Sequence, residues 1–448
     1  MRPREYEVED LAAYRGKIDA VTKSACDSFR RDAATVIARH GDPSAWTRAD
    51  KAEIRDSVAA LMSGHIDSHS AATQSLASRF VEDVLEAQGA GMTVDVVERD
   101  MSHPARQSAR YWYRRLDEGD VDGFVSGCES FVKRSVSHAG DISLLDGASG
   151  KKGRARLRYA RVPSGPTCPF CLMLASRGFD YLTPESAGEL SRFHDDCDCR
   201  VVAGYDGLKV KGYDYEGMRR RIGSCRETLG TPEEVWSDFA ALDSAEKSRY
   251  GRGVRVSNVK LPEELVERIG EQANAFNDYY CRRLMEEMRT RDRAWLFDGA
   301  EPRLGYENEA VKASKNANRT RRADHERELK TAKKLRDNGF ETVFVEDETK
   351  SASGDVVGHA DLANGIEIKT VYKASSENTI SKHIANCKGK KNLSRIVVDI
   401  SENPNLTDAE ATDYIAHSIW RHGFGKAFVL RHDGRLSRVR PERPGRNE

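Results

Sequence analysis

The stretch 358-GHADLANGIEIKT-370 contains two short runs of alternating apolar residues, joined by Asn364-Gly365. This pattern predicts a β-hairpin. In a bulged loop of three residues, 363–365, the glycine adopts the left-handed conformation and Leu362 pairs with Ile366. A two-residue turn is the alternative, and the two loops differ in which side chains share a face of the hairpin.

Three ionisable side chains depend on that loop. The longer loop places Asp361 opposite Glu367, with Lys369 on the same face, because alternate residues of a strand point the same way. The carboxylates would repel each other without a cation, and magnesium suits such oxygen ligands. A metal beside a lysine can activate water and stabilise the charge that develops when a phosphodiester is attacked. We therefore expect a catalytic site in which Asp361 and Glu367 bind Mg²⁺ and Lys369 assists.

The spacing Asp361, short gap, Glu367-x-Lys369 resembles the PD-(D/E)XK nuclease superfamily, although the proline of that name is absent. The resemblance implies that the two acids bind magnesium and that the lysine orients or activates water. The preceding segment, 328-ELKTAKKLRDNGF-340, is similar to the opening helix of that family. It implies that Glu328 supplies a further acid to the metal.

The order of elements around these residues extends the resemblance. We expect strands at 342–345 and 395–400, a helix at 376–386, a further helix capped by Thr407-Asp-Ala-Glu410, and a hairpin at 426–438. This order is similar to the tRNA nuclease toxin domains at the C-terminus of contact-dependent growth inhibition (CdiA-type) proteins. The similarity covers roughly residues 316–440. It implies tRNA or another nucleic acid as substrate and a cognate immunity protein as partner.

A plainer interpretation stands beside this one. Acids and lysines on an exposed strand face are ordinary solvated residues. His359 shares the face of Asp361, either as a proton-transfer group or as a surface histidine.

The 448-residue chain has 72 Lys and Arg against 72 Asp and Glu, so its formal charge is zero. This balance argues against a protein that coats nucleic acid through bulk charge, but it allows a local basic groove. No apolar run is long enough to span a bilayer, and the start Met1-Arg-Pro-Arg lacks a signal-peptide core. We expect a soluble protein made in a bacterial cytoplasm.

Cysteine and histidine cluster between residues 168 and 199, as Cys168-Pro-Phe-Cys171 and His194-Asp-Asp-Cys197-Asp-Cys199. A Cys-x2-Cys pair facing a His-x2-Cys pair presents a tetrahedral ligand set. We therefore expect a structural Zn²⁺ held by four of these five residues. Disulfide or redox chemistry and unligated packing cysteines are the alternatives.

The sequence around this cluster carries a second resemblance. The segment 158-RYARVPSGPTCPFCLMLASRGF-179, with the downstream His and Cys residues, resembles actinobacteriophage minor head proteins of the Mu F-like head morphogenesis group. The resemblance spans roughly residues 1–205. It implies a mostly helical protein that associates with portal and capsid proteins in the phage head.

The sequence thus predicts a multidomain chain, mostly α-helical in its N-terminal and middle regions, with a C-terminal α/β domain. Its predicted parts are a helical head domain (1–150), the Cys/His motif of that domain (151–210), a helical linker region (211–318) and a PD-(D/E)XK nuclease-like toxin domain (319–448). The basic run 312–322 would be an exposed connector.

The predicted function is that of a phage or prophage minor capsid protein. Its metal-dependent nuclease would act on tRNA in the cytoplasm of the target cell. The alternative is a structural head-assembly protein whose C-terminal domain is inactive or acts on phage DNA during packaging.

Overall fold

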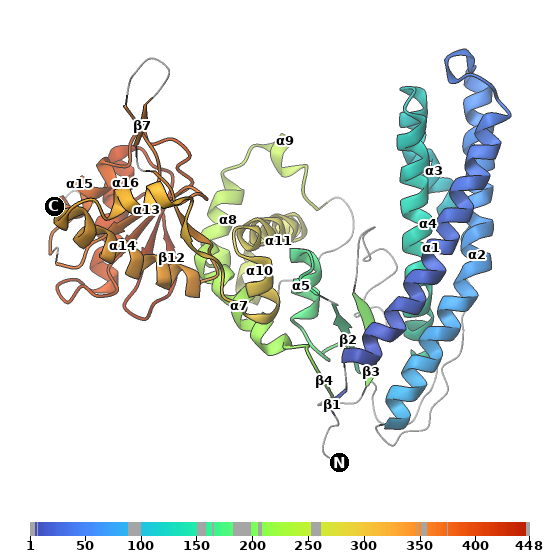
Figure 1. Cartoon of the computed structure of the whole chain (residues 1–448), viewed down its shortest axis with the longest axis horizontal. Coiled ribbons are helices and arrows are strands. Elements are labelled where there is room, and N and C mark those ends of the chain that lie inside the picture. The colour runs from blue at the N-terminus through green and yellow to red at the C-terminus, as the bar shows by residue number, and fades with distance from the viewer. Residues whose placement is uncertain are drawn as a thin grey trace. The chain divides into compact units, whose positions relative to one another are not determined.

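The computed structural model describes most of the chain (Figure 1). The described residues are 5–6, 8–87, 100–149, 158–163, 165–181, 199–204, 208–251, 261–346, 348–350, 356–373 and 375–444. The chain divides into two compact units, Met1–Thr167 with Leu174–Glu216 and Cys168–Met173 with Gly217–Glu448.

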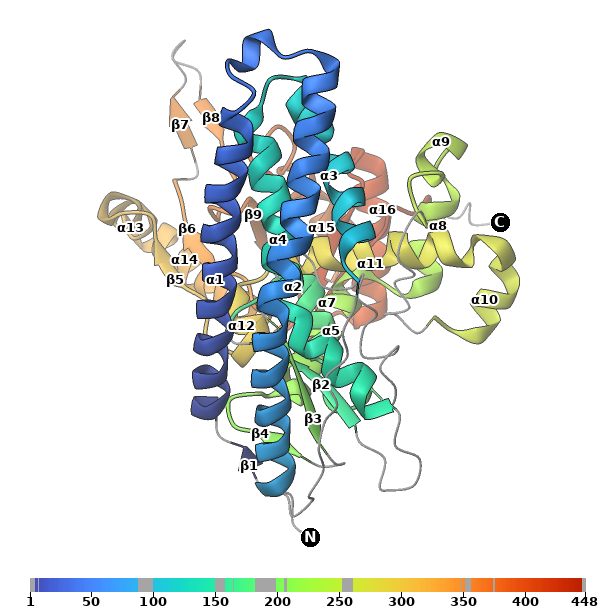
Figure 2. The same ribbon diagram turned by 90° about the vertical axis from the view of Figure 1, so that its right-hand side faces the viewer.

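The first unit is built on four helices, α1 (Val8–Ala38), α2 (Arg48–Ala87), α3 (Ser102–Asp117) and α4 (Val121–Ser149). Figures 1 and 2 show α1, α2 and α4 running alongside one another. Their facing sides bury one apolar cluster that includes Phe29, Val58, Met62 and Phe124. Apolar residues at three- and four-residue spacing produce this cluster, so the predicted helix bundle is confirmed.

Short strands complete this unit. β1 (Glu5–Tyr6) pairs in parallel with β4 (Lys209–Val210), and β2 (Arg158–Val162) pairs antiparallel with β3 (Arg200–Gly204). A short helix, α5 (Pro169–Ala175), begins directly after Cys168 and contains Cys171, and its residues up to Met173 belong to the second unit.

Helices form the first part of the second unit: α7 (Tyr215–Leu229), α8 (Pro232–Ala240), α9 (Ser244–Lys247), α10 (Glu263–Ile269), α11 (Ala273–Arg289) and α12 (Arg293–Asp298). We predicted helices here, and these are present. The boundary that we placed between residues 318 and 319 nevertheless lies inside one compact unit.

Most residues of the run 312–322 are exposed, as predicted, but the prediction that this run is an unstructured connector is wrong. The run consists of the end of α13 (Glu309–Lys315) and the start of α14 (Arg319–Asp337). The side chains of Asn308 and Asn318 cap these two helices, and Val311 is buried. The capping asparagines satisfy backbone N–H groups at both starts, so the basic run continues as helix.

A four-stranded sheet organises the rest of this unit. Its strands lie in the order β12-β11-β10-β9, with β9 (Ile366–Thr370), β10 (Arg395–Asp399) and β11 (Ala427–Leu430) parallel and β12 (Leu436–Val439) antiparallel. Parallel neighbours require crossovers, which α15 (Glu377–Ala385) and α16 (Asp408–His422) provide. The predicted helices, strands and final hairpin of this region are confirmed, including the capping box at Thr407.

Both faces of the sheet are covered. On one face, α15 and α16 pack on Ile396 and Val398, and on the other face α14 packs on Ile366 and Ile368. β5 (Leu304–Tyr306) pairs in parallel with β6 (Thr342–Phe344). Phe344 of β6 belongs to the apolar cluster that α14 forms with Ile366 and Ile368. A ribbon of β7 (Glu348–Lys350) and β8 (Val356–Gly358) leads toward β9, at the open edge of the sheet. Within the described residues, no helix has the length and apolar character to cross a membrane.

Candidate active site

The turn before β9 has the predicted three-residue loop. The Gly365 N–H donates to the Leu362 carbonyl at 2.8 Å, and the Leu362 N–H donates to the Ile366 carbonyl at 3.1 Å. Gly365 has φ +80°, the left-handed conformation that glycine adopts without strain. The predicted loop is therefore confirmed.

The hairpin ladder that we expected on either side of this loop is wrong. The segment before the loop pairs with β6 instead, because Ala363 donates to the Val343 carbonyl and Val345 donates to the Asp361 carbonyl. At the open edge of β9, the Ile368 N–H donates to the Asp361 Oδ2 at 2.7 Å. The Asp361 side chain thus accepts the hydrogen bond that a hairpin strand would have accepted with its backbone.

Asp361 and Glu367 are nevertheless brought together. The carboxylate of Glu367 is fully buried, and Asp361 is 5% exposed. Both approach the Nζ of Lys390, which lies 2.7 Å from Glu367 Oε1 and 4.0 Å from Asp361 Oδ1. Lys369 also donates to Glu367. Two ammonium groups therefore compensate two buried carboxylates that would be costly to bury alone.

The pKa values reflect this crowding. Burial, together with the nearby charges of Glu367 and Glu328, raises the pKa of Asp361 to about 7. Burial alone would lower the pKa of Lys369, but the charges of Glu367 and Asp361 raise it above its ordinary value. A buried acid with a raised pKa beside a second acid is typical of functional sites.

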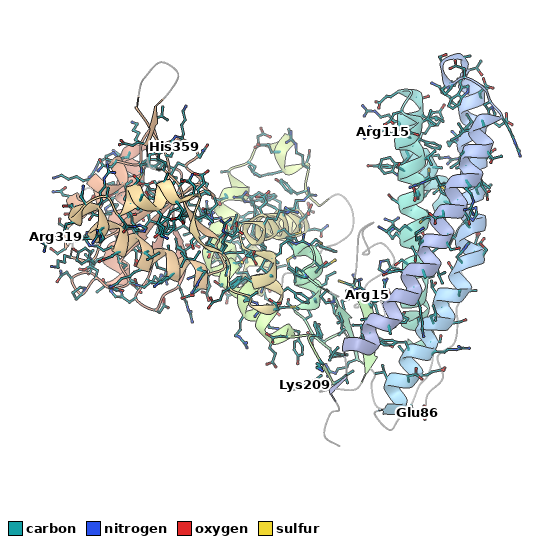
Figure 3. The ribbon with its side chains drawn as sticks, in the orientation of Figure 1. Arg15, Glu86, Arg115, Lys209, Arg319 and His359 are labelled. Atoms are coloured by element: carbon teal, nitrogen blue, oxygen red, sulfur yellow. The ribbon has the colours of Figure 1, made fainter. Side chains whose placement is uncertain are left out.

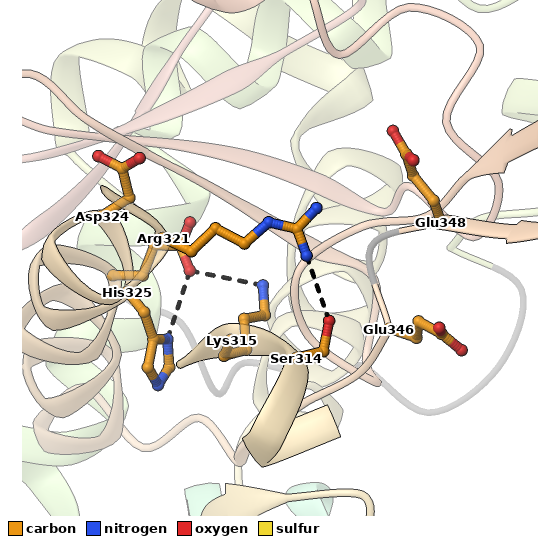
Figure 4. Close-up of a pocket in the computed structure, with 8 residues that line it drawn as sticks. Ser314, Lys315, Arg321, Asp324, His325, Glu346 and Glu348 are labelled. Carbon is orange, nitrogen blue, oxygen red and sulfur yellow. Dashed lines mark hydrogen bonds and ion pairs between the residues drawn. The ribbon is translucent and has the colours of Figure 1, made fainter. Parts of the chain in front are cut away.

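Glu328 approaches the site from α14. Its Oε2 lies 3.5 Å from Lys315 Nζ and 3.6 Å from His325 Nδ1, and the Nε2 of His325 lies 2.8 Å from the hydroxyl of Tyr306. Burial would raise the pKa of Glu328, but the neighbouring His325 and the charge of Lys315 bring it below its ordinary value. Glu328, Lys315 and His325 line a pocket of about 320 Å³ with further acids, Glu346 and Glu348 (Figure 4).

His359 follows β8 at the start of the segment that carries Asp361 (Figure 3). It forms a backbone bridge with Lys391 and is half-buried.

The carboxylates can be compared with what a metal requires. Within the described part of the chain, no three His, Cys, Asp or Glu side chains are grouped so that they could hold a metal ion. Magnesium needs less, because it commonly binds proteins through one or two carboxylates and retains several waters. The carboxylates of Asp361 and Glu367 already converge on one cation, the ammonium group of Lys390. The same arrangement of oxygens fits a magnesium ion.

The predicted zinc ligands are only partly described. The Cys171 N–H donates to Cys168 Sγ at 3.4 Å in the first turn of α5, and Cys199 is buried immediately before β3. His194 and Cys197 lie outside the described residues. The zinc site therefore stays a prediction.

Lys390 is the site residue that sequence reasoning missed. It follows α15 in the run Lys388-Gly389-Lys390-Lys391, far from the acids in sequence. The available signal was a glycine within a basic run directly after a helix. This pattern marks a turn, but it does not indicate which residue the neighbouring lysine contacts.

Comparison with known proteins gives a match to a protein family. Residues 6–225 match the model of a family described as VG15 protein, which is phage-associated. The match is consistent with a phage-related protein, and it ends before the sheet of the second unit begins. No curated protein matches the chain, and neither does any solved structure.

Proposed function

We propose that this chain is a phage minor capsid protein whose second unit is a magnesium-dependent nuclease of the PD-(D/E)XK type that cuts tRNA. The observation that carries the nuclease proposal is the burial of Asp361 and Glu367 around the ammonium group of Lys390 at the open edge of the sheet. Two buried carboxylates this close reduce stability, so a site that binds a cation explains them better than structure alone.

The residues divide into distinct roles. Asp361 and Glu367 would hold the magnesium ion, which would supply Lewis-acid polarisation of the phosphate and a water of lowered pKa. Lys369 lies two residues from Glu367 on the same strand and keeps a positive charge where the attacked phosphate gains negative charge. Glu328, held by Lys315 and His325, adds negative charge near Asp361, but it is not grouped with Asp361 and Glu367 as a third metal ligand.

The capsid part of the proposal rests on residues 6–225 and their match to a phage-associated family. A protein of the phage head contacts portal and capsid proteins, and a toxin carried there acts in the cytoplasm of the target cell. An immunity protein then protects the producing cell. The Cys/His cluster of this part contributes a structural Zn²⁺ and no catalysis, since a closed zinc site has no open position for substrate.

The test uses the full chain, mixed tRNA and supercoiled plasmid, each with Mg²⁺ or with excess EDTA. We expect tRNA to be cut in Mg²⁺ only. If the plasmid is nicked and tRNA is left intact, the substrate is DNA, and a role in packaging is favoured. If neither substrate is cut, the nuclease proposal is wrong.

A further inference from the structure

Lys390 occupies an unusual position between the two acids. Its Nζ lies 2.7 Å and 2.8 Å from the two carboxylate oxygens of Glu367 and 4.0 Å from Asp361 Oδ1. A cation that bridges both acids would contact the same oxygens. Lys369 differs, because its ammonium group forms an ion pair with Glu367 and, among the described residues, no direct ion pair joins it to Asp361.

The loop that carries Lys390 is fastened to the segments that carry the acids. The Lys391 N–H donates to the Gly358 carbonyl at 2.8 Å, and the Ser394 N–H donates to the Gly365 carbonyl at 2.8 Å. A Cβ on Gly365 would lie 2.0 Å from the Asn392 carbonyl oxygen, so the loop and the turn are in close contact.

The same loop adopts left-handed backbone conformations, which are uncommon for a residue other than glycine. Gly389 has φ +84°, and Asn392 has φ +59°, the one positive φ of a residue other than glycine in the described part of the chain. Such conformations persist where the surrounding structure enforces them, and they often occur near functional sites. Here they turn the chain back from α15 so that Lys390 reaches Glu367.

The two lysines also differ in freedom. Lys369 lies on β9, where its backbone is paired in register with Val398 of β10. Lys390 projects from a loop, although its side chain, at 18% exposed, is as shielded as that of Lys369 at 17%. Its flexible stem lets the ammonium move without movement of the backbone, because a lysine side chain has four rotatable carbon–carbon bonds.

We propose that Lys390 is the internal counter-cation of the acid pair and that a divalent metal binds by displacing its ammonium group. This inference rests on the proposed metal site and adds a competitor built into the chain. The carboxylates are neutralised by the protein itself when metal is scarce, and each metal ion that binds must first overcome that ion pair. Removal of the Lys390 charge therefore strengthens metal binding, although a residue that only supported the fold would leave it unchanged or weaken it.

The experiment is isothermal titration of Mg²⁺ into the full chain and its variants. Lys390→Met keeps the packing stem and removes the charge, and we expect it to bind Mg²⁺ at least about 10-fold more tightly than the wild type. Lys390→Arg keeps a charge and should stay close to the wild type. Lys391→Met is the matched control, because its exposed side chain lies next in sequence and its backbone hydrogen bond to Gly358 is retained.

The double variant Asp361→Asn, Glu367→Gln shows whether Mg²⁺ binds at these two acids. It should give no heat of Mg²⁺ binding in the titration. Thermal melting with and without Mg²⁺ checks that each variant is folded and should show a larger shift for Lys390→Met. If the wild type binds Mg²⁺ at these acids and Lys390→Met binds it equally or less tightly, the counter-cation role is refuted while the nuclease proposal stands. If no folded variant binds Mg²⁺, both are refuted.

Discussion

Glu287 Oε2 lies 2.8 Å from Arg395 Nη2, although 108 residues separate them in the chain. Glu287 also binds Arg291 at 2.7 Å, and all three side chains are buried. Burial alone would raise the pKa of Glu287, but the charges of Arg291 and Arg395 lower it to about 2. The pair connects α11 with the central strand β10, so the middle helices are part of the same folded unit as the sheet.

Glu287→Gln should therefore destabilise the second unit strongly. The change leaves two buried guanidinium groups without their carboxylate, which typically costs about 3–5 kcal/mol. Glu286→Gln is the control, because the neighbouring Glu286 side chain is 54% exposed in its pair with Arg283. Calorimetry of the full chain should show a lower unfolding temperature for the second unit in the first variant only.

The pH dependence provides a second check on Glu287. The pKa of Glu287 is about 2 in the folded state, below its ordinary 4.5. The charge of Glu287 therefore contributes fully to the free energy of unfolding above pH 4.5, and this contribution is lost as the pH falls toward 2. The wild type should lose about 3 kcal/mol across that window through this group. The same slope in Glu287→Gln would contradict the assignment.

Gly365→Ala should destabilise the site and displace the loop that carries Lys390. The new methyl group would meet the Asn392 carbonyl oxygen at 2.0 Å, in a backbone conformation with φ +80°. Strain and overpacking together should cost roughly 2–4 kcal/mol. Gly425→Ala is the control, because nothing lies within 4 Å of its added Cβ and no positive φ is involved. Equal unfolding temperatures for the two variants would refute the role given to this turn.

Asp361→Asn should stabilise the metal-free protein. The amide oxygen still accepts the Ile368 N–H, while the repulsion with Glu367 and Glu328 disappears. The pKa of Asp361 is raised from 3.8 to about 7 in the folded protein. The free energy of unfolding of the wild type therefore falls as the pH rises from 3.8 to about 7, and this group causes no further loss above pH 7. The difference in free energy of unfolding between Asp361→Asn and the wild type should grow over that pH range to at most about 4 kcal/mol. Unfolding in EDTA across this pH range measures it, and an advantage that shrinks with rising pH would contradict the account.

Metal analysis tests the zinc prediction. We expect about one zinc per chain, held by four of Cys168, Cys171, His194, Cys197 and Cys199. Cys168→Ser should release zinc and lower the unfolding temperature, while magnesium-dependent cleavage is retained. A chain that is fully folded without zinc would exclude the site.

Local sequence signals predicted much of this structure. Asn364-Gly365 predicted the loop, and Thr407 with Glu410 predicted the start of α16, because both depend on residues close together in the chain. The expected hairpin ladder failed because the segment before the loop pairs with β6, a choice made by tertiary packing.

Two relationships had no local signal. Lys390 reaches Glu367 only because β9 and β10 are parallel, so that the crossover through α15 brings the next loop back to the start of β9. Arg395 pairs with Glu287 across 108 residues, and nothing in either neighbourhood indicates the partner. Long-range ion pairs of this kind depend on the assembled fold.

The most direct test of the central claim is the initial rate of tRNA cleavage in Mg²⁺ by the full chain, measured for the wild type, Glu367→Gln and Glu341→Gln. Glu367 is fully buried within the site, whereas Glu341 is exposed. The account predicts that Glu367→Gln remains folded and lowers the rate by at least about 100-fold, while Glu341→Gln leaves it unchanged. A folded Glu367→Gln variant that cuts tRNA at the wild-type rate would contradict it.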